Sequence, residues 1–453
     1  RPRPFVVAYF GLASAASAIA GILGLAMVWD GAWYLFNILD RGKPFAPFAR
    51  WVNVPLDLPV VVARLLTHDT GLASLIFGLA YFAVPVVALA ASWWVVRNRA
   101  PRLFVWAAFG IGFVCLPGQA FAVSETMMAI QLAWPILLAA LAGSVRENRV
   151  LVAGLAIAVA LSVFVGIALL LGIAVASVIV RRFGRDGRVG NRFVLAMLGL
   201  AAVAAARSVI SLDFAAHASE AAASVLITRF RSSVLGLPLI SLTFTWVSGV
   251  LLVGATVGRL RKRRLLAIWL DRFAIVSALL ASLAMLLWAG DERNWRLALD
   301  YRAWLQFASV PVFGLALLDS LLAESAVPAE PADGGREREW IALTQAAATL
   351  IVLATLAISW HGLTTRLAQA LAIDPRGCVG IDSLGWTGTT AMNHWSLTVQ
   401  ALMVEGRQPR HIVLPSCAMD FSKVIHVTPW ATRRYSGGWF DMSALRSALV
   451  RTP

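Results

Sequence analysis

Charged side chains are scarce in this sequence. Asp, Glu, Lys and Arg make up 14% of the residues, while hydrophobic residues make up 59% and the mean hydropathy is +0.76. A soluble globular domain has about 25% charged residues. No soluble fold could cover so much apolar surface with so few polar side chains. The composition therefore excludes an ordinary soluble protein.

The motifs of common soluble enzymes are also missing. The sequence has no phosphate-binding glycine-rich loop, no cysteine pairs spaced for zinc and no nucleophile elbow. The net charge of +15 does not indicate nucleic-acid binding. Its basic residues sit in short clusters between apolar stretches, where they orient transmembrane helices.

Apolar stretches of about 20 residues recur along the chain, and a helix of that length crosses the roughly 30 Å hydrocarbon core of a bilayer. The first stretch, Phe5 to Val28, resembles a signal sequence but is too long and has no convincing cleavage site. We therefore predict an all-α polytopic membrane protein with about eleven transmembrane helices. The expected spans are 5–28, 71–96, 103–117, 127–143, 150–163, 165–180, 193–208, 237–257, 267–289, 304–322 and 341–360.

The basic clusters predict the orientation of these spans. With eleven spans, the clusters near residues 97–102, 146–149, 181–192 and 259–264 all fall on one side, which the positive-inside rule makes cytoplasmic. The apolar run 150–180 has basic residues at both ends, so we expect two short helices with a turn near Gly166. We expect a bacterial-type inner membrane, a cytoplasmic N-terminus and a polar cytoplasmic linker at 324–339.

The chain then divides into a transmembrane domain, 1–360, and an extracytoplasmic domain, 361–453. The tail has a strand at Cys378–Ile381, an amphipathic stretch at Ala391–Glu405 and a strand at His411–Leu414, which predicts a small α/β domain. An oxidising compartment would favour a disulfide between Cys378 and Cys417. Tryptophans of the tail, Trp439 among them, could pack its core or anchor it at the membrane interface, with stacking on a sugar as the alternative.

The first outer loop, 29–70, is the most informative segment for function. Asp30 and Tyr34 directly follow the first predicted helix, and Arg41 and Lys43 come soon after. A carboxylate at the edge of the bilayer could accept a proton from an acceptor hydroxyl, while the cations bind a lipid-linked phosphate. The stretch Trp51 to Leu66 is too short to span and could lie along the interface.

This arrangement resembles the GT-C superfamily of membrane glycosyltransferases, in which a catalytic acid follows the first helix and interfacial helices precede the second. The acid there often belongs to an Asp-Glu or similar pair followed by an aromatic residue, whereas here Asp30 is followed by Gly31, with Tyr34 nearby. The resemblance implies an inverting glycosyltransferase that takes a sugar from a polyprenyl-phosphate carrier, with Asp30 as general base. A structural role for Asp30, as a cap or a partner of Arg41, is the alternative.

Other candidate residues fall on the same predicted face. Glu125 and Asp213 are candidates for a second catalytic carboxylate or for a group that orients the acceptor. The cations that could bind the donor phosphate are Arg207, Arg293, Arg296 and Arg302. For the last three, the alternative is a solvated loop whose charges pair locally. No metal site is predicted; a divalent cation is left open, since the outer acids could bind one but lack a diagnostic spacing.

Two further classes of function fit the same composition. A lipid or solute transporter or flippase would place charges and broken helices at the middle of the membrane, and no such pattern is evident. A non-catalytic membrane subunit of an envelope assembly would use residues 361–453 to bind protein partners. A transferase would instead modify an envelope glycan, lipid or protein on the outer face.

Overall fold

The computed structural model describes residues 4–28, 30–115, 124–183 and 189–211, scattered positions between 247 and 280, and residues 312–321, 332–373, 378–380, 394–414, 439–441 and 443. Most of them are helical. In this part of the chain, five helices are long and apolar enough to cross a membrane. They are α1 (Pro4–Ile22), α4 (Thr70–Val96), α9 (Val165–Phe183), α10 (Asn191–Ile210) and residues Arg338–Ile373 of α16 (Ala332–Ile373).

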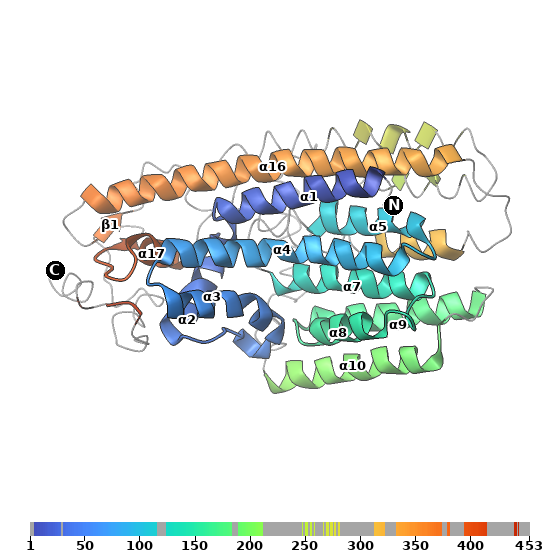
Figure 1. The fold of residues 1–453 in the computed structure, drawn as a ribbon, viewed down its shortest axis with the longest axis horizontal. Helices are drawn as coiled ribbons and strands as arrows, with labels where there is room; N and C mark the ends of the chain where they lie inside the picture. The colour runs from blue at the N-terminus through green and yellow to red at the C-terminus, as the bar shows by residue number, and fades with distance from the viewer. Residues whose placement is uncertain are drawn as a thin grey trace, which may run out of the picture.

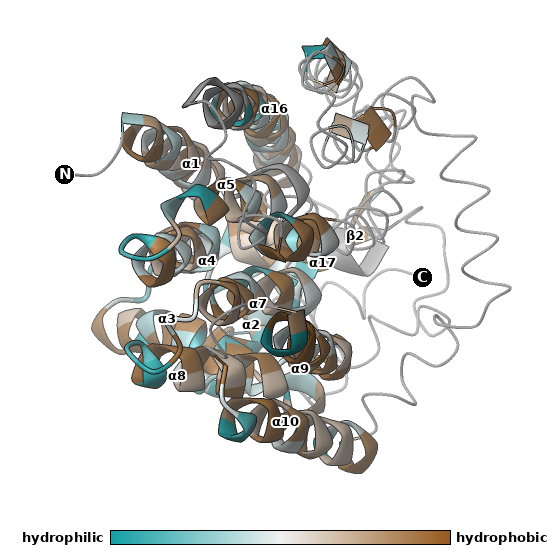
Figure 2. Ribbon diagram, turned by 90° about the vertical axis from the view of Figure 1, so that its right-hand side faces the viewer, coloured by the Kyte–Doolittle hydropathy of each residue, from teal (hydrophilic) through white to brown (hydrophobic). Residues whose placement is uncertain are grey.

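The long helices run side by side, with shorter apolar ones packed among and beside them (Figures 1 and 2). These are α7 (Glu125–Leu141), α8 (Arg149–Ala160), the helix Val312–Leu321, and α5 (Phe104–Ala107), which continues into the π-helix η5 (Ala108–Cys115). Helix α7 contacts α4, α8 and α9, and nearly all of its residues are buried. Viewed along the bundle, α7 lies between α4 and the pair α8 and α9 (Figure 2). It is the central helix of the described bundle.

The two ends of the bundle carry different elements. Helices α2 (Asp30–Arg41), α3 (Val54–Leu66) and α17 (His394–Glu405) lie at one end, and the N-terminus of α1 lies at the other (Figure 1). At that second end, Ser144 Oγ donates to the Val95 carbonyl at 2.7 Å and Arg99 forms an ion pair with Glu147. The basic clusters at 97–102 and 146–149 therefore share one end, as the sequence predicted.

The apolar run 150–180 is broken into two helices as expected, since α8 ends at Ala160 and α9 begins at Val165. The break lies at 161–164, just before Gly166, which is already in α9. The predicted first span, 5–28, is wrong at its end. Helix α1 stops at Ile22, because Gly24 has a left-handed backbone (φ 78°), and a short 3-10 turn, η1 (Leu25–Met27), follows. Asp30 consequently begins a separate helix, α2, rather than ending the first one.

The first outer loop, 29–70, is largely helical. Its predicted interfacial stretch, Trp51 to Leu66, contains the 3-10 turn η3 (Trp51–Asn53) and helix α3. Leu58, Val62 and Leu65 are exposed on α3. This apolar face is consistent with an interfacial position, which stays a prediction.

The predicted linker 324–339 is wrong in its second half, since α16 already begins at Ala332. Arg338 in α16 donates to Asp319 at 3.2 Å, and Trp106 Nε1 donates to the other carboxylate oxygen at 3.1 Å. This partly buried contact ties α16 to its neighbours. The predicted spans 237–257 and 267–289 lie mostly outside the described residues, so the count of eleven spans stays a prediction.

Helix α16 also extends beyond the predicted span 341–360. Its 42 residues correspond to about 63 Å at 1.5 Å per residue, roughly twice the hydrocarbon thickness of a bilayer. It reaches the end of the bundle where α17 and β1 (Cys378–Gly380) lie (Figure 1).

The described part of the tail has the predicted strand–helix–strand order. β1 pairs in parallel with β2 (Ile412–Leu414), and α17 lies between them in sequence. Helix α17 packs against α2, α4 and α16. Two three-residue strands packed beside the bundle do not establish a separate α/β domain.

Close helix packing at the α1–α4 contact depends on two glycines. A Cβ atom on Gly78 would lie 2.5 Å from the carbonyl oxygen of Gly21, and one on Gly21 would lie 3.1 Å from the Gly78 backbone. We expect Gly78→Ala to destabilise the protein by about 1–3 kcal/mol, because two backbones would have to separate. Gly11→Ala is the matched control on α1, since no atom lies within 4 Å of its Cβ position. Equal unfolding midpoints for the two variants would contradict this packing.

Candidate functional site

Glu125 begins the central helix α7 and is only 5% exposed. Ser124 caps the start of α7, since its Oγ accepts a hydrogen bond from the Met127 amide at 3.3 Å. The Ser124 amide in turn donates to Tyr81 Oη at 2.5 Å. A carboxylate in the first turn of a helix is stabilised by the unpaired backbone N–H groups there. The fold thus holds a carboxylate in the interior, at the end of the bundle that carries α2 and α3.

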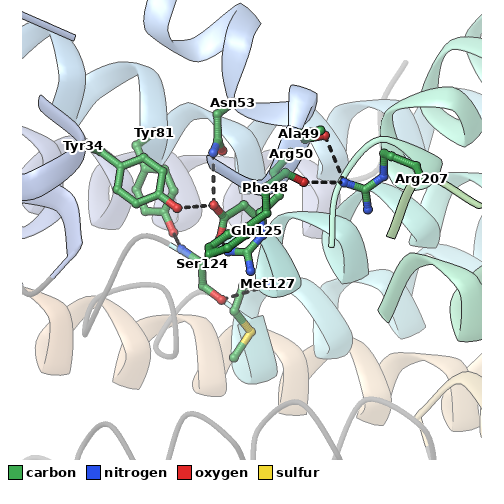
Figure 3. A network of polar contacts seen from close by, with 10 residues as sticks. All are labelled: Tyr34, Phe48, Ala49, Arg50, Asn53, Tyr81, Ser124, Glu125, Met127 and Arg207. Atoms are coloured by element: carbon green, nitrogen blue, oxygen red, sulfur yellow. Dashed lines mark hydrogen bonds and ion pairs between the residues drawn. The ribbon is translucent and has the colours of Figure 1, made fainter. Parts of the chain in front are cut away.

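Three side chains from the first outer loop donate to Glu125 (Figure 3). Tyr34 Oη and Asn53 Nδ2 donate to Oε1, the latter at 3.0 Å, and Arg50 Nη1 donates to Oε2 at 3.3 Å. Tyr34, Asn53 and Arg50 are all buried. We call these three residues with Glu125 the Glu125 network. Buried charges persist where they are paired and hydrogen-bonded, as here.

Tyr34 is a permanent donor in this network. Burial raises its pKa well above the ordinary value, and the negative charges of Glu125 and Asp30 raise it further. The hydroxyl therefore keeps its proton at physiological pH. It can orient a carboxylate or a substrate oxygen, but it does not act as a base.

Asp30 lies at the border of the network. It is the first residue of α2, one helical turn before Tyr34 and hence on the same helix face. Asp30 is partly exposed, whereas Glu125 is enclosed by its donors. Of the two carboxylates, Asp30 is the more accessible to a bound molecule.

A third carboxylate, Asp57, is buried next to this network. Its Oδ2 accepts from the Phe45 amide at 2.9 Å, and the side chain is almost fully buried. Burial raises its pKa to about 7; the Phe45 hydrogen bond opposes this shift and the charge of Glu125 adds to it. Asp57 thus titrates near neutral pH.

Asp57 predicts a specific pH dependence of stability. Its folded pKa of about 7 lies above the ordinary value of 3.8, so between these values the unfolded chain releases a proton that the folded chain keeps. Because the unfolded state then binds fewer protons, stability falls as pH rises through this window. Asp57→Asn cannot ionise at this position and serves as the reference. Relative to it, we expect the free energy of unfolding of the wild-type protein to fall by up to about 4 kcal/mol between pH 4 and 8. Thermal unfolding of both proteins across this range tests it, and parallel curves would contradict it.

Arg207, near the end of α10, contacts the same region. Its Nη1 donates to the carbonyl oxygens of Ala49 at 2.9 Å and Phe48 at 3.4 Å. These two residues directly precede Arg50 of the Glu125 network. Arg207 therefore binds the backbone beside the network (Figure 3).

The sequence-predicted site residues divide into three groups. Asp30, Tyr34 and Glu125 are brought together, and Arg207 lies beside them. Arg41 is the last residue of α2 and Lys43 lies on the connection that follows. Both are exposed, and the Arg41 guanidinium lies 5.2 Å from the Phe45 ring centroid. The predictions that lie outside the described residues are Asp213, Arg293, Arg296, Arg302 and Cys417. The backbone of Cys378 lies in β1, and its disulfide with Cys417 stays a prediction.

Sequence reasoning did not select Arg50, Asn53 or Asp57 as site residues. The signal that could have found them is their polarity within an apolar stretch, since Arg50 and Asn53 are separated by Trp51 and Val52. Within the described ranges, no three His, Cys, Asp or Glu side chains are grouped as a metal site would require. Comparison with known proteins adds nothing: no family model matches, and no curated protein or solved structure is significantly similar.

Proposed function

We propose that the chain is a membrane glycosyltransferase of GT-C type, which transfers a sugar from a polyprenyl-phosphate carrier to an envelope glycan, lipid or protein. The observation that carries this proposal is the arrangement of Asp30, a partly exposed acid, one turn from Tyr34 and beside the buried Glu125 network. This acid-rich site lies at one end of a bundle of apolar helices. A lipid-linked donor and a polar acceptor could both reach such a site.

In this proposal the helices lie in a bacterial inner membrane. The end with the basic residues at 97–102 and 146–149 is cytoplasmic by the positive-inside rule. The Glu125 network and the C-terminal domain, 361–453, then lie on the periplasmic face. Helix α3 rests at the interface through its exposed leucine and valine side chains.

The proposed reaction follows from the different surroundings of the acids. Asp30 accepts the proton of the acceptor hydroxyl while the oxygen of that hydroxyl bonds to the anomeric carbon of the sugar. The bond from the anomeric carbon to the phosphate oxygen breaks at the same time. The polyprenyl phosphate leaves with the electron pair, and the anomeric configuration inverts. Glu125, surrounded by donors, orients Tyr34 and Arg50 instead of receiving a proton. Arg41 and Lys43 are exposed cations that could bind the phosphate.

Reconstitution in liposomes tests the function directly. The purified chain would be supplied with polyprenyl-phosphate sugars labelled in the sugar, together with an envelope extract as acceptor. Label recovered in a product no longer attached to phosphate supports the transferase. Label that crosses the bilayer while still attached to its carrier would favour a flippase. Intact label, with the chain recovered in a stable complex, would favour a non-catalytic subunit.

A further inference from the structure

The loop that supplies Arg50 has an unusual backbone. Residues 42–53 join α2 to α3. Within the last ten of them, which we call the 44–53 loop, Phe48 (φ 51°) and Ala49 (φ 55°) both adopt the left-handed region. Residues with a Cβ atom rarely do so, and two in succession are rarer still. Such a conformation persists only where surrounding contacts impose it.

Arg207 supplies such a contact from a distant part of the sequence. Its guanidinium donates to the carbonyl oxygens of both left-handed residues. Hydrogen bonds from a charged donor are roughly twice as strong as neutral ones. On its other side, the loop is held by the Val52 amide, which donates to the Leu161 carbonyl at 3.3 Å in the α8–α9 connection.

The direction of Arg50 depends on this turn. Arg50 directly follows the two left-handed residues, and its guanidinium reaches Glu125 at 3.3 Å while lying 5.2 Å from the Phe48 ring centroid. If Phe48 and Ala49 relaxed to ordinary backbone angles, the chain direction at residue 50 would change. Arg50 would then no longer point at Glu125.

We infer that Arg207 is a positioning residue, which holds the 44–53 loop in its left-handed turn and so directs Arg50 to Glu125. Helix α10 packs against α8 and α9, at the outside of the described bundle. This guanidinium links α10 to the site through the loop that it binds. This role differs from the phosphate binding expected for Arg207 from the sequence. The positioning role of Arg207 deepens the proposed function. Of the tests below, only the measurement of transferase activity rests on that function.

Hydrogen–deuterium exchange of the whole chain in nanodiscs tests the inference without turnover. In Arg207→Met, we expect amide exchange in peptides covering 44–53 to rise about tenfold or more, because charged hydrogen bonds to the backbone are lost. Peptides from α4 and α7 should not change. Arg192→Met is the matched control, since this arginine is exposed at the start of the same helix. Unchanged exchange in the loop, or an equal rise throughout the protein, would overturn the inference.

A second substitution separates positioning from other roles. Ala49→Gly removes the steric penalty of the left-handed backbone, so the double variant Ala49→Gly with Arg207→Met should recover most of the slow exchange. Arg207→Lys, which keeps a cationic donor, should fall between the unchanged protein and Arg207→Met. Any transferase activity lost in Arg207→Met should return in the double variant. If Arg207 acted by binding phosphate, a glycine in the loop could not replace it. Loop amides that exchange as fast in the double variant as in Arg207→Met would therefore reject the inference.

Discussion

Replacing Glu125 with leucine is expected to destabilise the protein by about 3–5 kcal/mol, the range found when one partner of a buried ion pair is removed. Leucine fills a similar volume but accepts no hydrogen bond. Arg50, Asn53 and Tyr34 would remain buried without the carboxylate that now accepts from each of them. Denaturant unfolding of the purified protein in micelles measures the loss.

Glu147→Leu is the control for this prediction. Glu147 also forms an ion pair with an arginine, Arg99, but both side chains are exposed at the opposite end of the bundle. The Arg99 guanidinium lowers the pKa of Glu147, yet exposed pairs of this kind contribute little to stability. We expect no measurable change in the unfolding midpoint for Glu147→Leu.

The double variant Glu125→Leu with Arg50→Met identifies the cause of the instability. Removing the second charge leaves an apolar pair of similar volume, which is often as stable as a buried ion pair. The double variant should therefore recover more than half of the lost stability. A double variant that is less stable than Glu125→Leu alone would show that Arg50 stabilises the loop by other contacts.

The helices themselves could be predicted from the sequence because their signal is local. Apolar runs and basic flanks were sufficient to place α4, α7, α9 and α10 to within a few residues, and the break between α8 and α9 followed from the charge distribution alone. The end of α1 could not be predicted in this way. Hydropathy stays high through Val28, and the helix stops because of the left-handed backbone of Gly24, which leaves no mark on hydropathy.

Of the site, the sequence predicted the acids Asp30 and Glu125 and the neighbouring Tyr34, but not the third acid, Asp57. Asp30 and Glu125 follow apolar runs, so their positions relative to the bundle could be inferred. The roles of Arg50 and Asn53 depend on contacts with a residue more than 70 positions away in sequence, which no local pattern encodes. The same holds for Arg207, whose contacts lie more than 150 positions away, in the 44–53 loop.

Asp30→Asn is expected to reduce transferase turnover by about 100- to 10,000-fold, the usual contribution of a general base. Asparagine has nearly the same shape and keeps hydrogen-bonding capacity, but it cannot accept the proton of the acceptor hydroxyl. Because Asp30 is partly exposed at the start of α2, the substitution should change the unfolding midpoint little. The loss should appear in kcat, with KM for the lipid-linked donor nearly unchanged.

Asp69→Asn is the matched control, because Asp69 is an exposed acid at the start of α4 with a known structural role. Its carboxylate accepts from the Gly71 and Leu72 amides at 2.7 and 3.1 Å as a helix cap, and asparagine serves equally well there. Turnover in Asp69→Asn should therefore stay within about twofold of the unchanged protein, since a cap near the site takes no part in proton transfer. If Asp30→Asn kept its activity while Glu125→Gln lost it at unchanged stability, the base would be Glu125. The donors around Glu125 would then have to release it during the reaction.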